Sequence, residues 1–217
     1  MKAINPDGVF ASFRGAKTLH DMLVHSKLPM SKEVVYPSDE IIHESEDRRP
    51  SGGCVPCKRK CDLYNNFLKE TKIVYSYHTN SVFNINQNLN CDMQNMVYII
   101  NDLKCRLSSV GCTTYASKVR FRNHKSHIKH FKRTCEVSSH FADNTSIHNI
   151  NRDDNKSFTD SLSTEIEVIL IEQVDVSGVE DDPQSRLREC KKREWFWQNQ
   201  LKTLRQYGGM NIREEKV

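Results

Sequence analysis

The sequence predicts an α+β fold, in which short buried strands and amphipathic helices follow one another along the chain. Two apolar runs rich in β-branched residues, at 96–100 and 165–174, have the length and the flanking residues of strands. The segment 184–204 carries apolar side chains at helical spacing and indicates a long helix. These three segments predict a small sheet flanked by helices.

The N-terminal region, residues 1–50, is expected to be largely a polar linker, with a short helix around 18–26. A polar, acidic stretch follows at 36–47, and the Pro- and Gly-containing run 48–53 is typical of a linker. We therefore expect a boundary here, followed by an irregular cysteine-rich segment at 51–92 and a second domain at 93–217.

Three of the eight cysteines, Cys54, Cys57 and Cys61, lie close together in the sequence. The polar N-terminus does not begin a signal peptide and no run is long enough to span a bilayer, so an intracellular, reducing setting is expected. There, such a cluster is a candidate zinc site that is one ligand short, and His78 or Cys91 could supply the fourth ligand. Free thiols are the alternative. Cys135 and Cys190, far from the cluster, are expected to be small buried hydrophobes.

The remaining elements follow from apolar runs and from the turn residues between them. The sequence predicts strands at 72–77, 81–85 and one ending near 109–111, a helix at 115–132, a long loop at 141–163, a turn at 178–183, and a helix stop at Gly208 and Gly209. The polar stretch 144–160 is expected to be a surface loop.

The helix at 115–132 is strongly basic. Between Tyr115 and Cys135 there are seven Lys or Arg residues and no Asp or Glu. This pattern indicates a polyanion partner such as DNA, and a solvated helix face is the alternative. The candidate phosphate-binding side chains are Lys118, Arg122, Lys125 and Lys129.

Glu194 falls within the apolar stripe of the last helix, which comprises Leu187, Cys190, Trp197, Leu201 and Leu204. A carboxylate that faces a core is costly unless a metal ion or an arginine compensates its charge. The alternative is a glutamate at the edge of the stripe that reaches water.

Arg120 and His124 lie four residues apart, on one face of the basic helix. Phe121, Ile128 and Phe131 are the expected core contacts beside them. An arginine directed at a phosphate with a histidine nearby would suit phosphoryl chemistry, and two ordinary surface residues are the alternative.

The order of several short motifs resembles the GIY-YIG nuclease-like domain at the end of Penelope-type retroelement proteins. The resemblance covers about 88–211 and rests on these segments: 88–91 (NLNC), 95–100 (NMVYII), Cys105, 109–114 (SVGCTT), 119–125 (VRFRNHK), 193–197 (REWFW) and 209–211 (GMN). Upstream, 12–24 looks like the connector that follows the reverse transcriptase in those proteins, and the Cys54–Cys61 cluster looks like their cysteine-rich segment. The chain therefore resembles the tail of a larger element polyprotein without its polymerase.

The resemblance implies a small antiparallel sheet of about three strands, with helices packed around it, and a metal-dependent DNA endonuclease. Tyr98 would deprotonate the attacking water, Arg120 would stabilise charge on the phosphate, and His124 would assist by hydrogen bonding. Glu194 would hold one magnesium or manganese ion. Supporting roles fall to Gly111, at a tight turn close to the substrate, and to Asn211, which would order the end of the site.

The sequence departs from the family pattern at three positions. Ser109 stands where the second signature has tyrosine, and Tyr64 and Asp102 stand where family members commonly have cysteine. These departures leave two alternatives open, a non-catalytic nucleic-acid-binding module and a decayed element fragment. A transcription-factor zinc finger is disfavoured because no Cys-x-x-Cys pair precedes His124 and His127 at the usual spacing. DNA is the expected partner, with no membrane or small-molecule substrate, and a nuclear location is expected.

Overall fold

The structure, a computed structural model, describes residues 52–59, 61–178 and 182–212 of the chain. These residues belong to one compact unit, Arg48–Val217. The predicted connector at 1–50, including the short helix at 18–26, lies outside the described residues.

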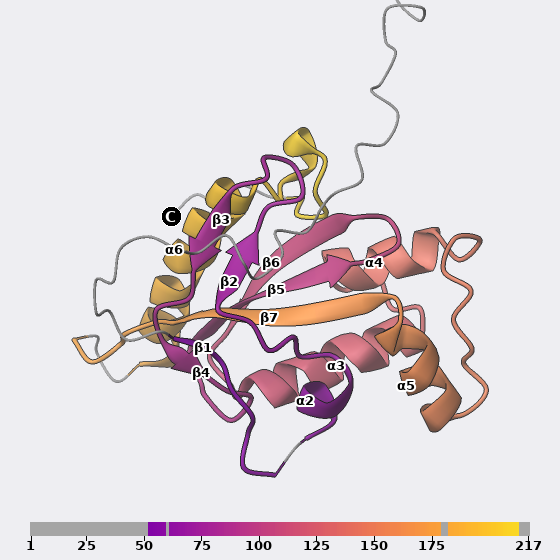
Figure 1. The fold of residues 1–217 in the computed structure, drawn as a ribbon, viewed down its shortest axis with the longest axis horizontal. Helices are drawn as coiled ribbons and strands as arrows, with labels where there is room; N and C mark the ends of the chain where they lie inside the picture. The colour runs from indigo at the N-terminus through magenta and orange to yellow at the C-terminus, as the bar shows by residue number, and fades with distance from the viewer. Residues whose placement is uncertain (1–51, 60, 179–181, 213–217) are drawn as a thin grey trace, which may run out of the picture. The chain divides into compact units, whose positions relative to one another are not determined.

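A three-stranded antiparallel sheet forms the centre of this unit (Figure 1). Its strand order is β6 (Leu107–Thr113), β5 (Met96–Asp102) and β7 (Ile166–Gln173). In this register Tyr98 of β5 lies opposite Gly111 on one side and Leu170 on the other. The α+β class and the small antiparallel sheet flanked by helices are therefore confirmed.

The middle strand β5 is buried along its whole length, because helices cover both faces of the sheet. Helix α6 (Pro183–Leu201) packs against β6 and β5. Helices α2 (Asp62–Asn66), α3 (Ser117–Lys129) and α5 (Asn155–Ser163) lie on the other side (Figure 1). A continuous apolar run suits a strand enclosed in this way.

The cysteine-rich segment packs against this sheet through short strands. Strand β1 (Gly53–Cys54) pairs in parallel with β4 (Asn88–Leu89), and β2 (Ile73–Tyr75) pairs with the antiparallel β3 (Val82–Asn84). The chain just before β2 runs beside β7. There the Lys69 N–H donates to the Val168 carbonyl at 2.9 Å, and the Val168 N–H donates to the Phe67 carbonyl at 2.8 Å.

The prediction of a long loop at 141–163 is wrong, because this region contains the end of α4 (Glu136–Asp143) and all of α5. Asp154 caps α5, since its carboxylate accepts hydrogen bonds from the backbone N–H groups of Lys156 (2.7 Å) and Ser157 (2.9 Å). Phe158 is fully buried in the core. A short, mostly polar helix with a good cap and few apolar anchors gave too weak a periodicity to be detected.

Helix α6 begins where the sequence predicts, with Asp182 as its cap and Pro183 in its first turn. It ends at Leu201, earlier than predicted, because Lys202 adopts a left-handed conformation (φ 55°). The chain then turns back toward β6, where the Met210 N–H donates to the Ser108 carbonyl at 3.0 Å.

Most of the predicted core positions on the helices are buried, with two exceptions. The buried stripe of α6 contains Cys190, Trp197 and Leu201, whereas Leu187 is 37% exposed. Phe131, expected in the core, is 46% exposed because it lies past the end of α3 with a positive φ. Among the described helices, none is both long enough and apolar enough to cross a membrane.

Candidate functional site

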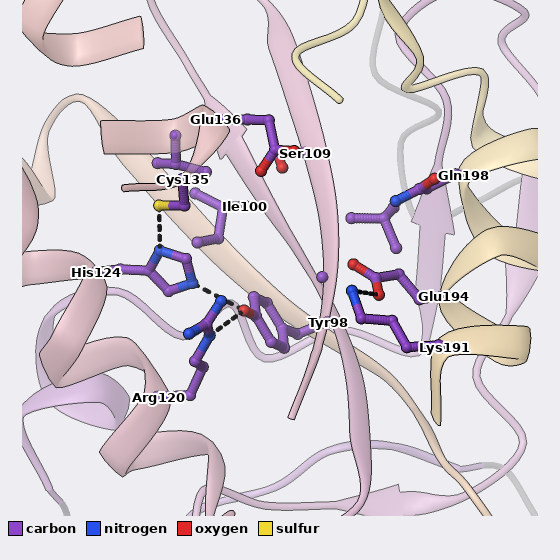
Figure 2. A pocket seen from close by; sticks show the side chains of 13 residues that line it. Tyr98, Ile100, Ser109, Arg120, His124, Cys135, Glu136, Lys191, Glu194 and Gln198 are labelled. Carbon is purple, nitrogen blue, oxygen red and sulfur yellow. Dashed lines mark hydrogen bonds and ion pairs between the residues drawn. The ribbon is translucent and has the colours of Figure 1, made fainter. Parts of the chain in front are cut away.

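All four side chains predicted to act in catalysis line one cavity of about 80 Å³. Tyr98 comes from β5, Arg120 and His124 come from α3, and Glu194 comes from α6. In Figure 2, Tyr98 lies between Arg120 and His124 on one side and Glu194 on the other. The geometry therefore joins residues that are far apart in the sequence.

The Tyr98 hydroxyl is buried and joins two residues of α3. The Arg120 Nε–H donates to the Tyr98 oxygen at 3.0 Å, and this oxygen lies 2.8 Å from His124 Nε2. Burial raises the pKa of Tyr98 well above its ordinary value, although the neighbouring Arg120 opposes the shift. The phenol is therefore protonated and can donate its own hydrogen to His124.

His124 is neutral because burial, together with the positive charge of Arg120, lowers its pKa to about 3. With Nε2 accepting from Tyr98, the proton of the ring resides on Nδ1, which lies 3.5 Å from Cys135 Sγ. Cys135 is half-buried and lines the cavity, so the prediction of a buried hydrophobe is wrong at this position, whereas Cys190 is buried as predicted.

Glu194 is 6% exposed, so the interpretation of a glutamate that reaches water is wrong. Its Oε2 lies 2.7 Å from Lys191 Nζ and accepts a hydrogen bond from the Cys112 thiol at 3.2 Å. Burial and the charge of Glu194 both raise the pKa of Cys112, which keeps this thiol protonated and able to donate. The compensating cation is a lysine one turn away on α6, not the arginine that the sequence analysis considered.

Ser109 and Gly111 line the same cavity, and Asn211 bonds to Ser109. The expected tight turn at Gly111 is wrong, because this residue lies within strand β6. An added Cβ at Gly111 would lie 2.7 Å from the Tyr98 hydroxyl oxygen, so only glycine permits this close approach between β6 and the phenol. Asn211 fixes the backbone of β6, because its Oδ1 accepts from the Val110 N–H (2.9 Å) and its Nδ2 donates to the Val110 carbonyl (3.0 Å). The same Nδ2 donates to Ser109 Oγ at 3.2 Å.

The four predicted phosphate-binding side chains lie on α3, where three of them have protein partners. Lys118 pairs with Asp92, Lys125 pairs with Asp62 at 2.8 Å, and Lys129 donates to Asn155 at 2.6 Å. Arg122 is exposed. A phosphate would therefore have to exchange with existing partners at the three lysines.

The first potential metal-binding group consists of Cys57, Cys61 and Cys91, whose sulfur atoms all lie within 4.8 Å of one another. Cys91 is one of the two candidates that the sequence offered as a further ligand. Cys54 is not part of the group, which corrects its assignment as a ligand. Its thiol donates to the Leu170 carbonyl at 3.3 Å, because the pairing of β1 with β4 draws it into the core.

A second potential metal-binding group, which the sequence analysis missed, consists of Asp102, Cys105, His140 and His148. Asp102 Oδ2 lies 2.7 Å from His140 Nε2 and 3.1 Å from His148 Nε2, and Cys105 Sγ lies 3.4 Å from the same His148 nitrogen. One carboxylate oxygen, one sulfur and two imidazole nitrogens are a ligand set suited to zinc or a similar ion.

Neighbouring groups hold this second set in place. Glu165 Oε2 lies 3.0 Å from His148 Nδ1, the arrangement that commonly orients a ligating histidine. Burial alone would raise the pKa of Asp102. However, hydrogen bonds from His140 and from the backbone N–H groups of Cys105 and Lys104, with the charge of His148, outweigh burial and lower it. The two histidines lie eight positions apart, across a helix end and a loop, which matches no common zinc spacing.

In comparisons with known proteins, no family model, no curated protein and no solved structure matches this chain. The resemblance to the Penelope-type domain therefore rests on the order and spacing of the residues quoted above.

Proposed function

We propose that this chain is a metal-dependent DNA endonuclease that hydrolyses phosphodiester bonds, of the GIY-YIG type and derived from a mobile element. The observation that carries the proposal is the shared cavity of Tyr98, Arg120, His124 and Glu194. A phenol next to a neutral imidazole, a guanidinium and a buried carboxylate together provide a proton path, a phosphate-binding cation and a metal ligand.

In this proposal the attacking water gives its proton to the Tyr98 oxygen while Tyr98 passes its own hydrogen to His124 Nε2, 2.8 Å away. Arg120, whose Nε already donates to the Tyr98 oxygen, is placed to stabilise negative charge on the phosphate. The side chain of Ser109 is shorter than that of a tyrosine and does not extend as far into the cavity. Tyr98 is therefore the phenol that takes part in the reaction, among the residues that line this cavity. Asn211 and Gly111 keep β6 at the distance that Tyr98 requires.

The residues present fit a divalent cation, because Glu194 brings a carboxylate to the wall of the cavity. Magnesium or manganese bound there supplies Lewis-acid stabilisation of charge on the phosphate and on the leaving oxygen. We further propose that zinc binds the Cys57, Cys61 and Cys91 group and the group centred on Asp102, with a structural role in both places.

Nicking of supercoiled plasmid DNA with Mg²⁺ or Mn²⁺ tests the proposal. We expect Glu194→Gln and Arg120→Ala each to lower the nicking rate by about 100-fold or more, as loss of a group that stabilises the transition state does. The matched controls are Glu189→Gln on α6, at a half-buried residue, and Arg133→Ala, at an exposed one; both form ion pairs and neither lines the cavity. Salt-sensitive DNA binding without nicking would support a binding module instead, and neither activity would leave a decayed fragment.

A further inference from the structure

Gln198 presents a buried polar atom that has no hydrogen-bond partner within the described structure. The residue is 4% exposed, and its Oε1 is one of the few buried side-chain oxygens left unpartnered. An unsatisfied buried oxygen of this kind costs about 1–3 kcal/mol, so such atoms in folded proteins usually have a water, an ion or a functional role to account for them.

This amide lies at the cavity that contains Glu194. Gln198 follows Glu194 by four residues on α6, so both side chains project from the same face of the helix. Both residues line the cavity, and Figure 2 shows them on the same side of Tyr98, across from Arg120 and His124.

The chemistry of this pair favours a hard cation. A carboxylate oxygen and an amide oxygen are ligands that Mg²⁺ and Mn²⁺ prefer, and neither offers the nitrogen or sulfur that zinc prefers. The immediate surroundings of Glu194 also include the ammonium of Lys191, 2.7 Å from Oε2. A divalent cation at this carboxylate would therefore displace the ammonium of Lys191.

We propose that Gln198 is a second protein ligand, through its amide oxygen, of the divalent cation that Glu194 binds. This inference rests on the proposed function, because it assigns a role within the same site. It also explains why a buried glutamine stands between Trp197 and Leu201, where a leucine would pack without leaving an unsatisfied oxygen.

The test measures Mn²⁺ binding without DNA, by the electron paramagnetic resonance signal of free Mn²⁺ during titration of zinc-loaded protein. Only the Mn²⁺ binding that is lost in the Glu194→Gln variant is assigned to this site. We expect Gln198→Leu to weaken this binding by about tenfold or more, and Gln198→Glu to strengthen it, because a second carboxylate replaces the amide. The control is Thr203→Val, which removes another unpartnered buried oxygen away from the cavity and should leave the affinity unchanged.

Wild-type affinity in Gln198→Leu would overturn the inference, because the buried amide would then serve only packing or a bound water. An absence of Glu194-dependent Mn²⁺ binding in the wild-type protein would overturn it as well. If Gln198→Leu fails to fold, as judged by circular dichroism, the Gln198→Glu variant provides the test. Mn²⁺ binding that is unchanged or weaker in Gln198→Glu would also overturn the inference. Mn²⁺ binding that follows these expectations in a protein that does not nick DNA would refute the nuclease proposal and leave this inference standing.

Discussion

At the scale of single residues, the site contains a histidine that is uncharged before substrate binds. His124 is enclosed between the Tyr98 hydroxyl and the Cys135 thiol, with Arg120 on the same helix. Because the pKa of His124 is lowered in the folded protein, protonation of its imidazole destabilises the folded state. This property belongs to the protein alone and can be measured without substrate or metal.

We predict that His124 makes the protein less stable as the pH falls below about 6.5. In the unfolded chain this residue binds a proton near the ordinary histidine pKa of 6.5, whereas in the folded chain it does so only near 3, so stability is lost as the pH decreases between these values. At pH 5 the loss amounts to about 2 kcal/mol, from roughly 1.4 kcal/mol for each pH unit.

Urea unfolding of the wild type and of His124→Asn at pH 7 and pH 5 checks this prediction. The free energy of unfolding should fall by about 2 kcal/mol more in the wild type than in the variant. Equal losses in the two proteins would mean that His124 is hydrated or already charged, which would contradict the enclosed environment described above.

At the scale of elements, α6 supplies one wall of the cavity, and its lysines differ in what they contact. Lys191 pairs with Glu194 inside the cavity, while Lys192 pairs with Glu189 on the exposed face, and both N–O distances are 2.7 Å. The helix is anchored to β7 because Glu172 accepts hydrogen bonds from Arg193 Nη2 (2.8 Å) and from the Trp197 indole (2.6 Å). The cavity-facing pair can therefore change without loss of the anchor.

We predict that Lys191 competes with a divalent cation for the Glu194 carboxylate. Removing the ammonium in Lys191→Gln should tighten Mn²⁺ binding by roughly two- to fivefold, since a partly exposed ion pair contributes about 1 kcal/mol or less. Isothermal titration calorimetry measures the affinity, and Lys192→Gln is the control that removes the same charge one residue further along. Equal gains in both variants would point to a general effect of net charge and would sink the idea of direct competition.

The elements that the sequence predicted correctly are those with sustained apolar patterns. Strands β5 and β7 and helix α6 bury long runs, so their periodicity survives in a single sequence. Helix α5 was missed because Phe158 and Leu162 are its only large apolar anchors and the rest of its stability comes from the Asp154 cap. Local polar contacts of this kind leave little pattern in the hydrophobicity.

Among the site residues, some could be singled out from local sequence patterns and others only from the family motifs or the tertiary structure. The helix face singled out the carboxylate at position 194 but left open a glutamate that reaches water, whereas Tyr98 was assigned only through the order of family motifs. His140 and His148 lie far from Asp102 in the sequence, and the fold brings them together. No rule of ligand spacing in the sequence predicts this contact. The exclusion of Cys54 from the thiol group likewise follows from the pairing of β1 with β4.

At the scale of the whole molecule, each of the two potential metal-binding groups joins segments that are distant in the sequence. One joins the chain before α2 to the residues after β4, and the other joins the end of β5 to α4 and to the chain before α5. Because an unfolded chain lacks such sites, any metal bound there would contribute its binding free energy to folding.

We predict that the purified protein contains zinc and that chelation lowers its thermal unfolding temperature by at least about 5 °C, since 1 kcal/mol corresponds to about 2–4 °C at this size. Metal content by atomic emission and unfolding by circular dichroism measure the two effects. His148→Ala should lose about one zinc ion per chain, whereas His130→Ala, at an exposed histidine after α3, should lose none. A protein that contains no zinc, with an unfolding temperature insensitive to chelators, would contradict this prediction.

The return of the chain from α6 to the sheet has a consequence for self-association. Strand β6 is an outer strand of the sheet. Unpaired backbone groups along such an edge can bind a strand of another molecule and begin aggregation. Met210 and Asn211 bond to the backbone of Ser108 and Val110 and so occupy these groups, as residues 67–69 do along β7. The residues that order the cavity thus also shield the sheet from edge-to-edge polymerisation, and selection for solubility alone could preserve them.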